Sequence, residues 1–367
     1  MNRQEFAASL FPSLPSGARI LIIRLRSIGD ILLLTPALCL LKEWRPDFQV
    51  SVVVEPRFRE LLEGNPDVDE ILEPGIGSGF EKIAARFRAV RELRRRRFSL
   101  CVNLHGGPTS SLLTRGSGAR WKAGFEHFRS RRGYDVLIPD ARTILGQSSI
   151  HTAEHQASAF FYLGMPRREI PRARLSLNSA HQEWWSKKRG ALGIGAPRQY
   201  ALIHPTALYA TKQWAPEHFA QLGIYLEREM ELATVFSCGP GEGTVLDVVE
   251  RAASTPLRRV ESASLGEFAA VLAEARLSVG NDSGPAHMAA ALGRPVVVIF
   301  GSSSSQIWGP WPRRAGGRVV QNFYDCNPCP GDHCYRFERP ECILSVSFEQ
   351  VRSAVASILV ESAQTSR

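Results

Sequence analysis

Ser27-Ile28-Gly29-Asp30 and Asn281-Asp282-Ser283-Gly284-Pro285-Ala286-His287 are the two segments that decide the fold of this chain. Each follows an apolar, β-branched run, at 20–23 and 276–280, and each opens a segment of helical character. A strand that feeds a helix through a tight Gly-containing turn is where open α/β sheets build ligand sites, because the helix N-terminus directs free N–H groups at an anion. The two turns lie about 250 residues apart, which predicts two Rossmann-like halves that face each other across a cleft.

Strand and helix patterns alternate twice along the chain, and this predicts two parallel sheets with helices on both faces. In the first half the expected strands span 19–25, 50–54, 70–72, 99–104 and about 119–123, and the expected helices span 30–45, 56–63, 80–96 and 152–163. In the second half strands are expected at 201–204, 232–237, 276–280 and 295–300, and helices at 216–229, 242–253, 265–274, 285–292 and 344–363. Residues 124–150 are predicted to form loops with short elements, and 166–178 a linker. We therefore expect domains over 1–175 and 176–345, followed by a C-terminal helix and tail over 346–367.

The composition, with 44% hydrophobic and 22% charged residues, is that of a soluble globular protein. The longest apolar stretch, Ile31–Leu41, is too short to cross a bilayer, and no signal-peptide pattern opens the chain. These features predict a cytoplasmic protein.

The net charge of +9 lies entirely in the first half of the chain. Residues 1–180 contain 27 Lys and Arg against 18 Asp and Glu, whereas 181–367 contain 18 of each. This asymmetry favours an anionic partner for the first half: nucleic acid, a phospholipid surface or a phosphorylated glycolipid. No nucleic-acid-binding motif accompanies the charge, so nucleic acid is the least favoured. The run Arg94–Arg97 has a purely structural interpretation as well, because cations suit the C-terminal end of a helix.

Four of the seven cysteines form a C-x2-C-x4-C-x7-C cluster in a Pro/Gly-rich stretch. Such a cluster can hold a structural zinc ion or an iron–sulfur centre, or can form disulfides, which a cytoplasmic location disfavours. The cluster consists of Cys326, Cys329, Cys334 and Cys342. The other three, Cys39, Cys101 and Cys238, lie in apolar segments and are predicted to be buried packing residues.

Asp30 and the loop at 204–214 carry the residues best suited to catalysis. Asp30 is either an N-terminal helix cap or, at the end of the first strand, a general base for an attacking hydroxyl. Thr206 and Lys212 lie on one strand-to-helix loop, where a hydroxyl donor and an ammonium suit a diphosphate. The alternative for Lys212 is an ordinary solvated surface lysine.

Further binding candidates follow two other predicted strands. Glu242 follows the glycines of 239–241 and either binds ribose hydroxyls or only opens a helix. In the segment from Asn281, Asp282 suits sugar hydroxyls, while the N–H groups of Ser283 and Gly284 suit a phosphate at the helix start. His287 is either a binding residue or a core histidine. The pair Asp67-Val68-Asp69 reads as a solvated turn rather than a metal-binding D-x-D motif, and we expect no catalytic metal.

Taken together, these motifs resemble glycosyltransferase family 9, the ADP-heptose:lipopolysaccharide heptosyltransferases. The matching pieces are R-L-R-S-I-G-D-I-L-L-L-T-P-A-L from Arg24, G-N-P-D-V-D-E-I-L from Gly64, H-P-T from His204 with the later K-Q-W-A-P-E-H-F-A-Q-L, and N-D-S-G-P-A-H-M-A-A-A-L-G-R-P-V-V-V-I-F-G from Asn281. They cover nearly the whole chain in order. Asn103-Leu104-His105-Gly106 stands where many members carry Asp-Leu-Gln-Gly.

The resemblance implies a two-domain GT-B fold and inverting, metal-independent transfer of a sugar, without a cofactor, from a nucleotide-diphosphate donor such as ADP-heptose to a lipopolysaccharide inner-core acceptor. It assigns the base role to Asp30 and the diphosphate to Lys212 and Thr206, with Glu242 at the adenosine ribose. The first domain would bind an anionic glycolipid, for which we expect Arg57, Arg115, Arg120 and Lys122, with peripheral contact to the inner membrane surface. Two alternatives remain open: a GT-B transferase or epimerase for another nucleotide sugar, and a non-catalytic module that binds glycolipid or nucleotide.

Overall fold

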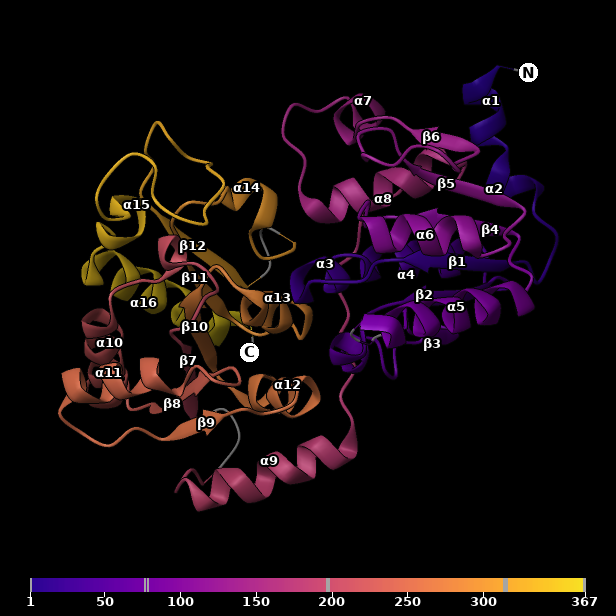
Figure 1. Ribbon diagram of the computed structural model, residues 1–367. Helices are drawn as coiled ribbons and strands as arrows, with labels where there is room; N and C mark the ends of the chain where they lie inside the picture. Colours follow the sequence, from indigo (N-terminus) through magenta and orange to yellow (C-terminus); the bar gives the residue numbers. More distant parts are fainter. Residues whose placement is uncertain (1, 76, 78, 196–198, 313–315, 366–367) are drawn as a thin grey trace. The chain divides into compact units, whose positions relative to one another are not determined.

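A computed structural model describes the chain apart from residues 1, 76, 78, 196–198, 313–315 and 366–367. The chain divides into two compact units, Met1–Ser176 (unit 1) and Leu177–Arg367 (unit 2), each an open sheet covered by helices (Figure 1). The division falls within the predicted linker. The last two residues of the predicted tail lie outside the described part.

Unit 1 is built on a six-stranded sheet in which all neighbouring strands are parallel. Its strands are β1 (Arg19–Ile23), β2 (Gln49–Val53), β3 (Glu70–Leu72), β4 (Leu100–Asn103), β5 (Trp121–Phe125) and β6 (Val136–Ile138). The order is β3-β2-β1-β4-β5-β6. Residues 20–23 of β1 are fully buried, as expected of a central parallel strand that helices cover on both faces.

The helices of unit 1 form two groups. They are α1 (Arg3–Ala8), α2 (Leu10–Ser13), α3 (Ile28–Leu32), α4 (Thr35–Trp44), α5 (Gly79–Arg95), α6 (Pro108–Gly116), α7 (Ala141–Leu145) and α8 (Thr152–Tyr162), with a 3₁₀ helix, η1 (Pro56–Leu61). α5 packs beside α6, and α4 packs beside α8. Leu93 of α5 and Leu113 of α6 share a core with Leu21 and Ile23 of β1, so these two helices cover one face of the sheet.

Unit 2 repeats the arrangement. Its strands are β7 (Tyr200–His204), β8 (Ala233–Cys238), β9 (Arg259–Glu261), β10 (Leu277–Asn281), β11 (Val296–Phe300) and β12 (Gly317–Gln321). They are parallel, in the order β12-β11-β10-β7-β8-β9. The third crossover therefore returns past the first strand in both units. Each sheet has a switch point, between β1 and β4 and between β7 and β10, and ligands of such sheets bind beyond the carboxyl ends of the strands at that point.

The C-terminal helix belongs to the core of unit 2 rather than to a separate segment. The helices of this unit are α9 (Ser179–Ala191), α10 (Pro216–Arg228), α11 (Gly243–Ala253), α12 (Leu265–Glu274), α13 (Gly284–Ala291), α14 (Ser305–Trp308), α15 (Glu341–Leu344) and α16 (Phe348–Thr365), with a 3₁₀ helix, η2 (Ala210–Lys212). Val351 and Val355 of α16 are buried with Phe219 of α10 and Ile299 of β11. The apolar stripe of α16 thus completes the sheet's cover.

Several elements differ from the sequence predictions. The helix expected over 30–45 is broken at Leu33 and Leu34, because Pro36 lacks the N–H that a continuous helix needs. The segment at 56–63 is a 3₁₀ helix. β6, β9 and β12 were not predicted as strands, since they are short and stand at or near sheet edges, where one apolar face suffices. α9 was also missed, because only Trp185 is buried in it. Among the described helices, none has the length and apolar composition that crossing a membrane requires.

Candidate active site

Asp30 lies in the first turn of α3, just beyond the carboxyl end of β1 at the switch point of unit 1. Its Oδ2 accepts hydrogen bonds from Ser27 N (3.1 Å) and Ser27 Oγ (3.3 Å), while the guanidinium of Arg24 pairs with Oδ1. Gln156 of α8 donates to the backbone carbonyl of Asp30 (2.8 Å). The carboxylate caps its helix, and its side chain is still 16% exposed. Capping and access to a ligand are therefore compatible here.

Next to this turn, the end of β4 presents His105. Asn103 Oδ1 accepts from the backbone N–H groups of His105 (2.9 Å) and Gly106 (3.2 Å) and so fixes the turn. Gly106 has φ of +74° and lies against the ring of Phe128, where a Cβ would come within 2.3 Å. Burial, and then the positive charge of Arg24, lowers the pKa of His105, so its imidazole is neutral at pH 7.

A second histidine stands on α8. The ring of His155 stacks on Phe125 of β5 at 4.2 Å, and His127 lies 5.2 Å from the same phenyl ring. Burial, and then the neighbouring His127, lowers the pKa of His155 to about 4. His105 and His155 were not predicted as site residues. Only the pairing of β1 with β4 and of β4 with β5 brings them to the edge of the sheet that carries Asp30. The His105 departure from the family motif was the one available signal.

Arg57 is the predicted acceptor cation that stands on Asp30's edge of the sheet. It lies in η1, which follows the carboxyl end of β2 and contacts α3. Its guanidinium pairs with Glu55 (2.9 Å) and lies 4.6 Å from the ring centroid of Phe58. Arg26, between β1 and α3, is exposed on the same edge.

The other three predicted acceptor cations lie toward the opposite edge. Arg120 precedes β5 and Lys122 is near its start, where Lys122 lies 3.8 Å from Asp135. Arg115 is in the last turn of α6, which runs back from the carboxyl edge. A five-residue strand separates the two edges by about 16 Å. Net charge identified these residues, but net charge does not say at which end of a strand a residue falls.

Both aspartates of the D-x-D segment form ion pairs with other parts of unit 1. Asp67 pairs with Arg174 (2.8 Å), and burial raises the pKa of the Asp67 carboxyl. Asp69 pairs with Lys42 (2.9 Å) and accepts from Val50 N (2.6 Å). The prediction of a solvated turn is wrong for Asp67, which is buried; the polar character of the pair reflects its ion pairs.

In unit 2, Lys212 and Asp282 meet at the switch point. Lys212 ends η2, after β7, and Asp282 follows β10. The Nζ–Oδ2 distance is 2.7 Å, and Ser303 Oγ donates to the same oxygen at 2.5 Å. Asp282 is buried, whereas the Lys212 side chain is 24% exposed. Lys212 is therefore a fixed ammonium with one open side, unlike the solvated lysine that was the alternative.

Asn281 orders the loops around this pair. Its Oδ1 accepts from Trp214 N (3.0 Å), and its Nδ2 donates to Pro205 O (2.8 Å). One side chain thus ties both ends of the loop from β7 to the end of β10. Ser283 occupies the N-cap position of α13 and Gly284 is its first residue, so their N–H groups stand at the helix start. His287 is buried one turn further along α13.

A chain of hydrogen bonds runs from β8 to Glu242. The distances are 3.0 Å for Ser237 Oγ to His204 Nδ1, 2.9 Å for His204 Nε2 to Thr206 Oγ1, and 2.7 Å for Thr206 Oγ1 to Glu242 Oε2. Burial lowers the pKa of His204 to about 4, so the ring is neutral. Since Thr206 donates to the carboxylate, its oxygen accepts from Nε2–H, and Nδ1 accepts from Ser237. Glu242 also accepts from Gly239 N (2.8 Å). His204 and Ser237 were not predicted.

The loop from Cys326 to Cys342 (the cysteine loop) is bonded to Thr211, the residue that precedes Lys212. Thr211 Oγ1 donates to the carbonyl of Gly331, and Ser302 Oγ donates to Thr211 Oγ1 (3.0 Å). Ser302 N donates to Thr211 O (3.3 Å), and Cys329 N donates to Ser302 O (3.1 Å). Asn327 Nδ2 donates to Gly301 O (2.7 Å). The loop from Cys326 to Cys342 is thereby fastened to the residue that precedes Lys212.

All four clustered cysteines are free thiols that line one small pocket with Thr211 and Ser302. Burial, and then the neighbouring thiols, raises the pKa of Cys342 to about 11. Within the described residues, no group of three or more His, Cys, Asp or Glu side chains is arranged to hold a metal ion. The predicted structural metal at Cys326, Cys329, Cys334 and Cys342 thus has no ligand set in this arrangement. It stays a prediction, which elemental analysis of the purified protein tests.

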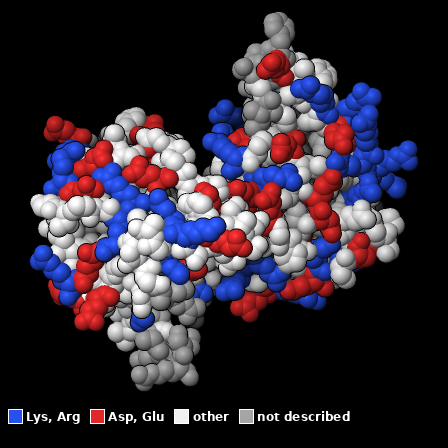
Figure 2. Space-filling model, turned by 90° about the horizontal axis from the view of Figure 1, so that it is seen from below, with Lys and Arg blue, Asp and Glu red and all other residues white. Residues whose placement is uncertain are grey.

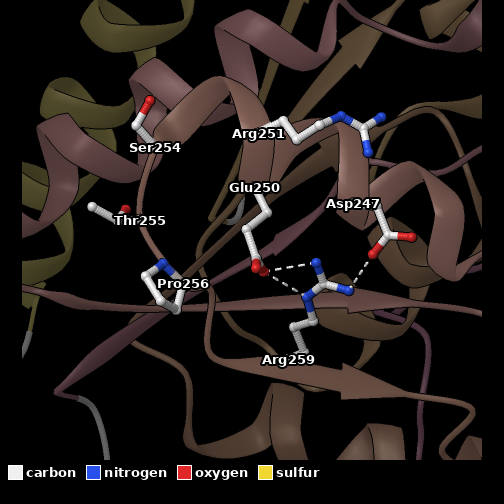
Figure 3. Close-up of a pocket in the computed structure, with 7 residues that line it drawn as sticks. All are labelled: Asp247, Glu250, Arg251, Ser254, Thr255, Pro256 and Arg259. Atoms are coloured by element: carbon white, nitrogen blue, oxygen red, sulfur yellow. Dashed lines mark hydrogen bonds and ion pairs between the residues drawn. The ribbon is translucent and has the colours of Figure 1, made fainter.

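A hollow of about 440 Å³ lies on unit 2, away from these residues (Figure 3). It is at the C-terminal end of α11, toward the amino edge of the sheet. The guanidinium of Arg259 forms ion pairs with three carboxylates, those of Glu250 (2.7 Å), Asp247 (2.7 Å) and Glu261 (3.3 Å). This hollow is a surface ion-pair cluster, and size alone does not make it a binding site.

Two parallel α/β units, each with polar residues at its switch point, define a GT-B glycosyltransferase fold. Solved structures agree with this class. The family 9 glycosyltransferase of Veillonella parvula has a TM-score of 0.81 at 22% identity and covers 95% of this chain and 99% of its own. Escherichia coli heptosyltransferase WaaC with ADP-2-deoxy-2-fluoro heptose has a TM-score of 0.68 at 20% identity and covers 92% and 99%.

The sequence comparisons identify the family. The model of glycosyltransferase family 9 (heptosyltransferase) matches residues 86–336. Lipopolysaccharide heptosyltransferase 3 of Escherichia coli K12 is 26% identical over 353 residues, which are 92% of this chain and 97% of that protein. The chain belongs to glycosyltransferase family 9, and the predicted resemblance, GT-B fold and enzyme class are confirmed.

Proposed function

We propose that this protein transfers a sugar, heptose from ADP-heptose, to a lipopolysaccharide inner-core acceptor with inversion at the anomeric carbon and without a metal ion. The observation that carries the proposal is twofold: the switch point of unit 1 carries a partly exposed carboxylate, and the switch point of unit 2 carries a fixed, partly exposed ammonium. Asp30 and Lys212 are those two groups. The relatives' names supply the heptose and the lipopolysaccharide.

Unit 1 supplies the base. The acceptor hydroxyl attacks the anomeric carbon from the side opposite the leaving diphosphate, and Asp30 takes its proton. Ser27 and Arg24 hold the two carboxylate oxygens in place, and the side chain as a whole is 16% exposed.

Unit 2 supplies the leaving-group site. Negative charge develops on the departing phosphate, where preorganised donors are most effective. Lys212 and the N–H groups of Ser283 and Gly284 at the start of α13 are the donors in this proposal, whereas the hydroxyl of Thr206 donates to Glu242. Asp282 repels phosphate and suits sugar hydroxyls. Glu242 binds ribose hydroxyls and is already oriented by Gly239 and Thr206.

Release of nucleoside diphosphate is the direct test. The protein is incubated with ADP-heptose, with and without deacylated inner-core lipopolysaccharide, in buffer containing EDTA. The proposal expects acceptor-dependent ADP release that EDTA does not reduce, and a product whose anomeric configuration, read by NMR, is opposite to that of the donor. Retained configuration, or activity that EDTA abolishes, contradicts the mechanism.

A parallel panel of UDP- and GDP-sugars separates the alternatives. Turnover of another donor supports a different transferase, and sugar epimerisation without acceptor supports an epimerase. Binding of ADP without any turnover supports a non-catalytic module. A bound donor also raises the melting temperature by mass action, so binding is measured independently of turnover.

A further inference from the structure

Helix α5 turns an unusual face to solvent. Ala85 and Leu93 face the core with Val90 and Ala89, yet Phe87 is 72% exposed and Ile83 is 54% exposed on the opposite side. These two apolar side chains are one helical turn apart. A large exposed phenyl ring has a hydrophobic cost in water that a binding partner would remove.

The second half of the same outward face is cationic. Within α5, exposed arginines follow Phe87 at Arg88, Arg91 and Arg95. Among their described acidic neighbours, Glu92 lies 3.4 Å from Arg95. On the face drawn in Figure 2, Lys and Arg side chains gather most densely at the right-hand edge, over unit 1. An apolar patch bordered by arginines on a single helix is the pattern of helices that lie in a membrane interface.

The apolar end of α5 is on the edge that carries Asp30. Arg86 Nη2 donates to Thr109 Oγ1 (2.8 Å), and Thr109 lies in the first turn of α6, just beyond the carboxyl end of β4. The cationic end lies at the other edge, where Arg96 pairs with Glu70 at the start of β3 (2.6 Å). Phe87 is the middle residue of α5, so the exposed apolar part of the helix runs from the edge with Asp30 to mid-helix.

We infer that the outward face of α5 docks on an anionic phospholipid bilayer. The phenyl ring of Phe87 enters the headgroup region while Arg88 and Arg91 contact lipid phosphates. The inference rests on the proposed function, since an acceptor with a lipid anchor presents its sugars at that surface. It names the docking face, which neither the net charge nor the family does.

Sedimentation with vesicles tests the inference on the full-length protein. Vesicles of phosphatidylcholine alone are compared with vesicles of equal parts phosphatidylcholine and phosphatidylglycerol. We expect binding to the anionic vesicles only, weakened by salt. Phe87→Ser should lower the partition coefficient about tenfold, and Arg88→Gln with Arg91→Gln about fivefold for each arginine.

Matched controls come from unit 2. Phe323→Ser removes a phenyl ring that is 76% exposed, and Arg228→Gln with Arg251→Gln removes two exposed arginines; these variants should bind as the wild type does. Failure of the wild type to bind anionic vesicles, or equal losses in the control and α5 variants, overturns the inference, as does retention on heparin without vesicle binding. Transfer to a deacylated acceptor should be unchanged in Phe87→Ser. A protein without transferase activity whose vesicle binding still depends on Phe87 refutes the proposed function alone.

Discussion

The two units have the same strand order and carry different chemistry at the same topological position. At the switch point of unit 1 stands Asp30, held by Arg24; at that of unit 2 stands Lys212, held by Asp282. Each ion pair is local to its unit, and the more exposed member is the carboxylate of Asp30 in unit 1 and the ammonium of Lys212 in unit 2. The fold therefore decides where polar residues gather in each unit, and the turn residues decide which charge is exposed there.

The largest expected effect is on the unit 1 side. Asp30→Asn should reduce kcat about 1,000-fold, because a positioned base contributes between about 10² and 10⁴ in rate. ADP binding, measured by calorimetry, should be unchanged, since that site belongs to unit 2. Asp140→Asn is the control, because Asp140 follows β6 on the same edge and pairs with Arg142 (2.9 Å). Turnover of Asp30→Asn comparable to that control would remove Asp30 from the base role.

On the unit 2 side, Lys212→Ala should lower kcat about 100-fold and weaken ADP binding as well, because the ammonium acts on the diphosphate in the ground state and the transition state. Lys212→Arg keeps the charge and should recover part of both. Lys188→Ala, an exposed lysine of α9, is the control. If Lys212→Ala loses rate and keeps full ADP affinity, the two units do not divide the reaction as proposed.

Most of the fold could be predicted from the sequence because buried parallel strands have a distinct pattern. β11, and β1 after Arg19, are continuous apolar runs, and the Gly-containing turns that follow β1 and β10 indicated the switch points. The elements that were missed depend on packing that no local pattern encodes. β12 is only partly buried along β11, and the α3–α4 break reflects one proline inside an apolar stretch.

The candidate site was predictable only in its charged residues. Asp30, Lys212, Thr206 and Asp282 lie in the segments that follow β1, β7 and β10, so the sequence predicts their edge. The residues that orient them come from distant segments: Gln156 reaches Asp30 from α8, and Ser303 reaches Asp282 from beyond β11. Net charge was a poor guide to the acceptor cations, because it does not distinguish the two edges of a sheet.

Acid should weaken both units through one buried histidine in each. Burial lowers the pKa of His155 in unit 1 and of His204 in unit 2 to about 4, below the value near 6.5 of an unfolded chain. The unfolded state therefore binds the proton first. The stability from the neutral ring is present above pH 6.5 and is lost as the pH falls toward 4. Between pH 7.5 and 5 the loss is about 2 kcal/mol for each ring.

Urea unfolding at pH 7.5 and pH 5 measures this loss. His155→Phe keeps the stacking on Phe125 and should abolish the unit 1 share, whereas His204→Gln should abolish the unit 2 share. His333→Gln changes an exposed histidine and should leave the pH dependence as it is. If His155→Phe and His204→Gln both lose as much free energy of unfolding between pH 7.5 and pH 5 as the wild type does, burial of these rings is not the cause.

The smallest effect concerns how unit 2 holds its lysine. Thr211→Val removes the hydroxyl that joins Gly331 and Ser302 while it keeps the side chain's shape, and a lost buried hydrogen bond typically costs about 1 kcal/mol. ADP affinity should fall about fivefold and kcat by a similar factor, because Lys212 follows directly on the loosened residue.

Thr234→Val is the control, since Thr234 is also buried and donates to Glu227 (2.7 Å) at the start of β8. Thr211→Ser retains the hydroxyl and should bind ADP normally. Equal ADP affinity in Thr211→Val and Thr234→Val would mean that the cysteine loop stabilises unit 2 without positioning Lys212. A loss of ADP affinity in Thr211→Val alone would mean that the cysteine loop helps to position Lys212.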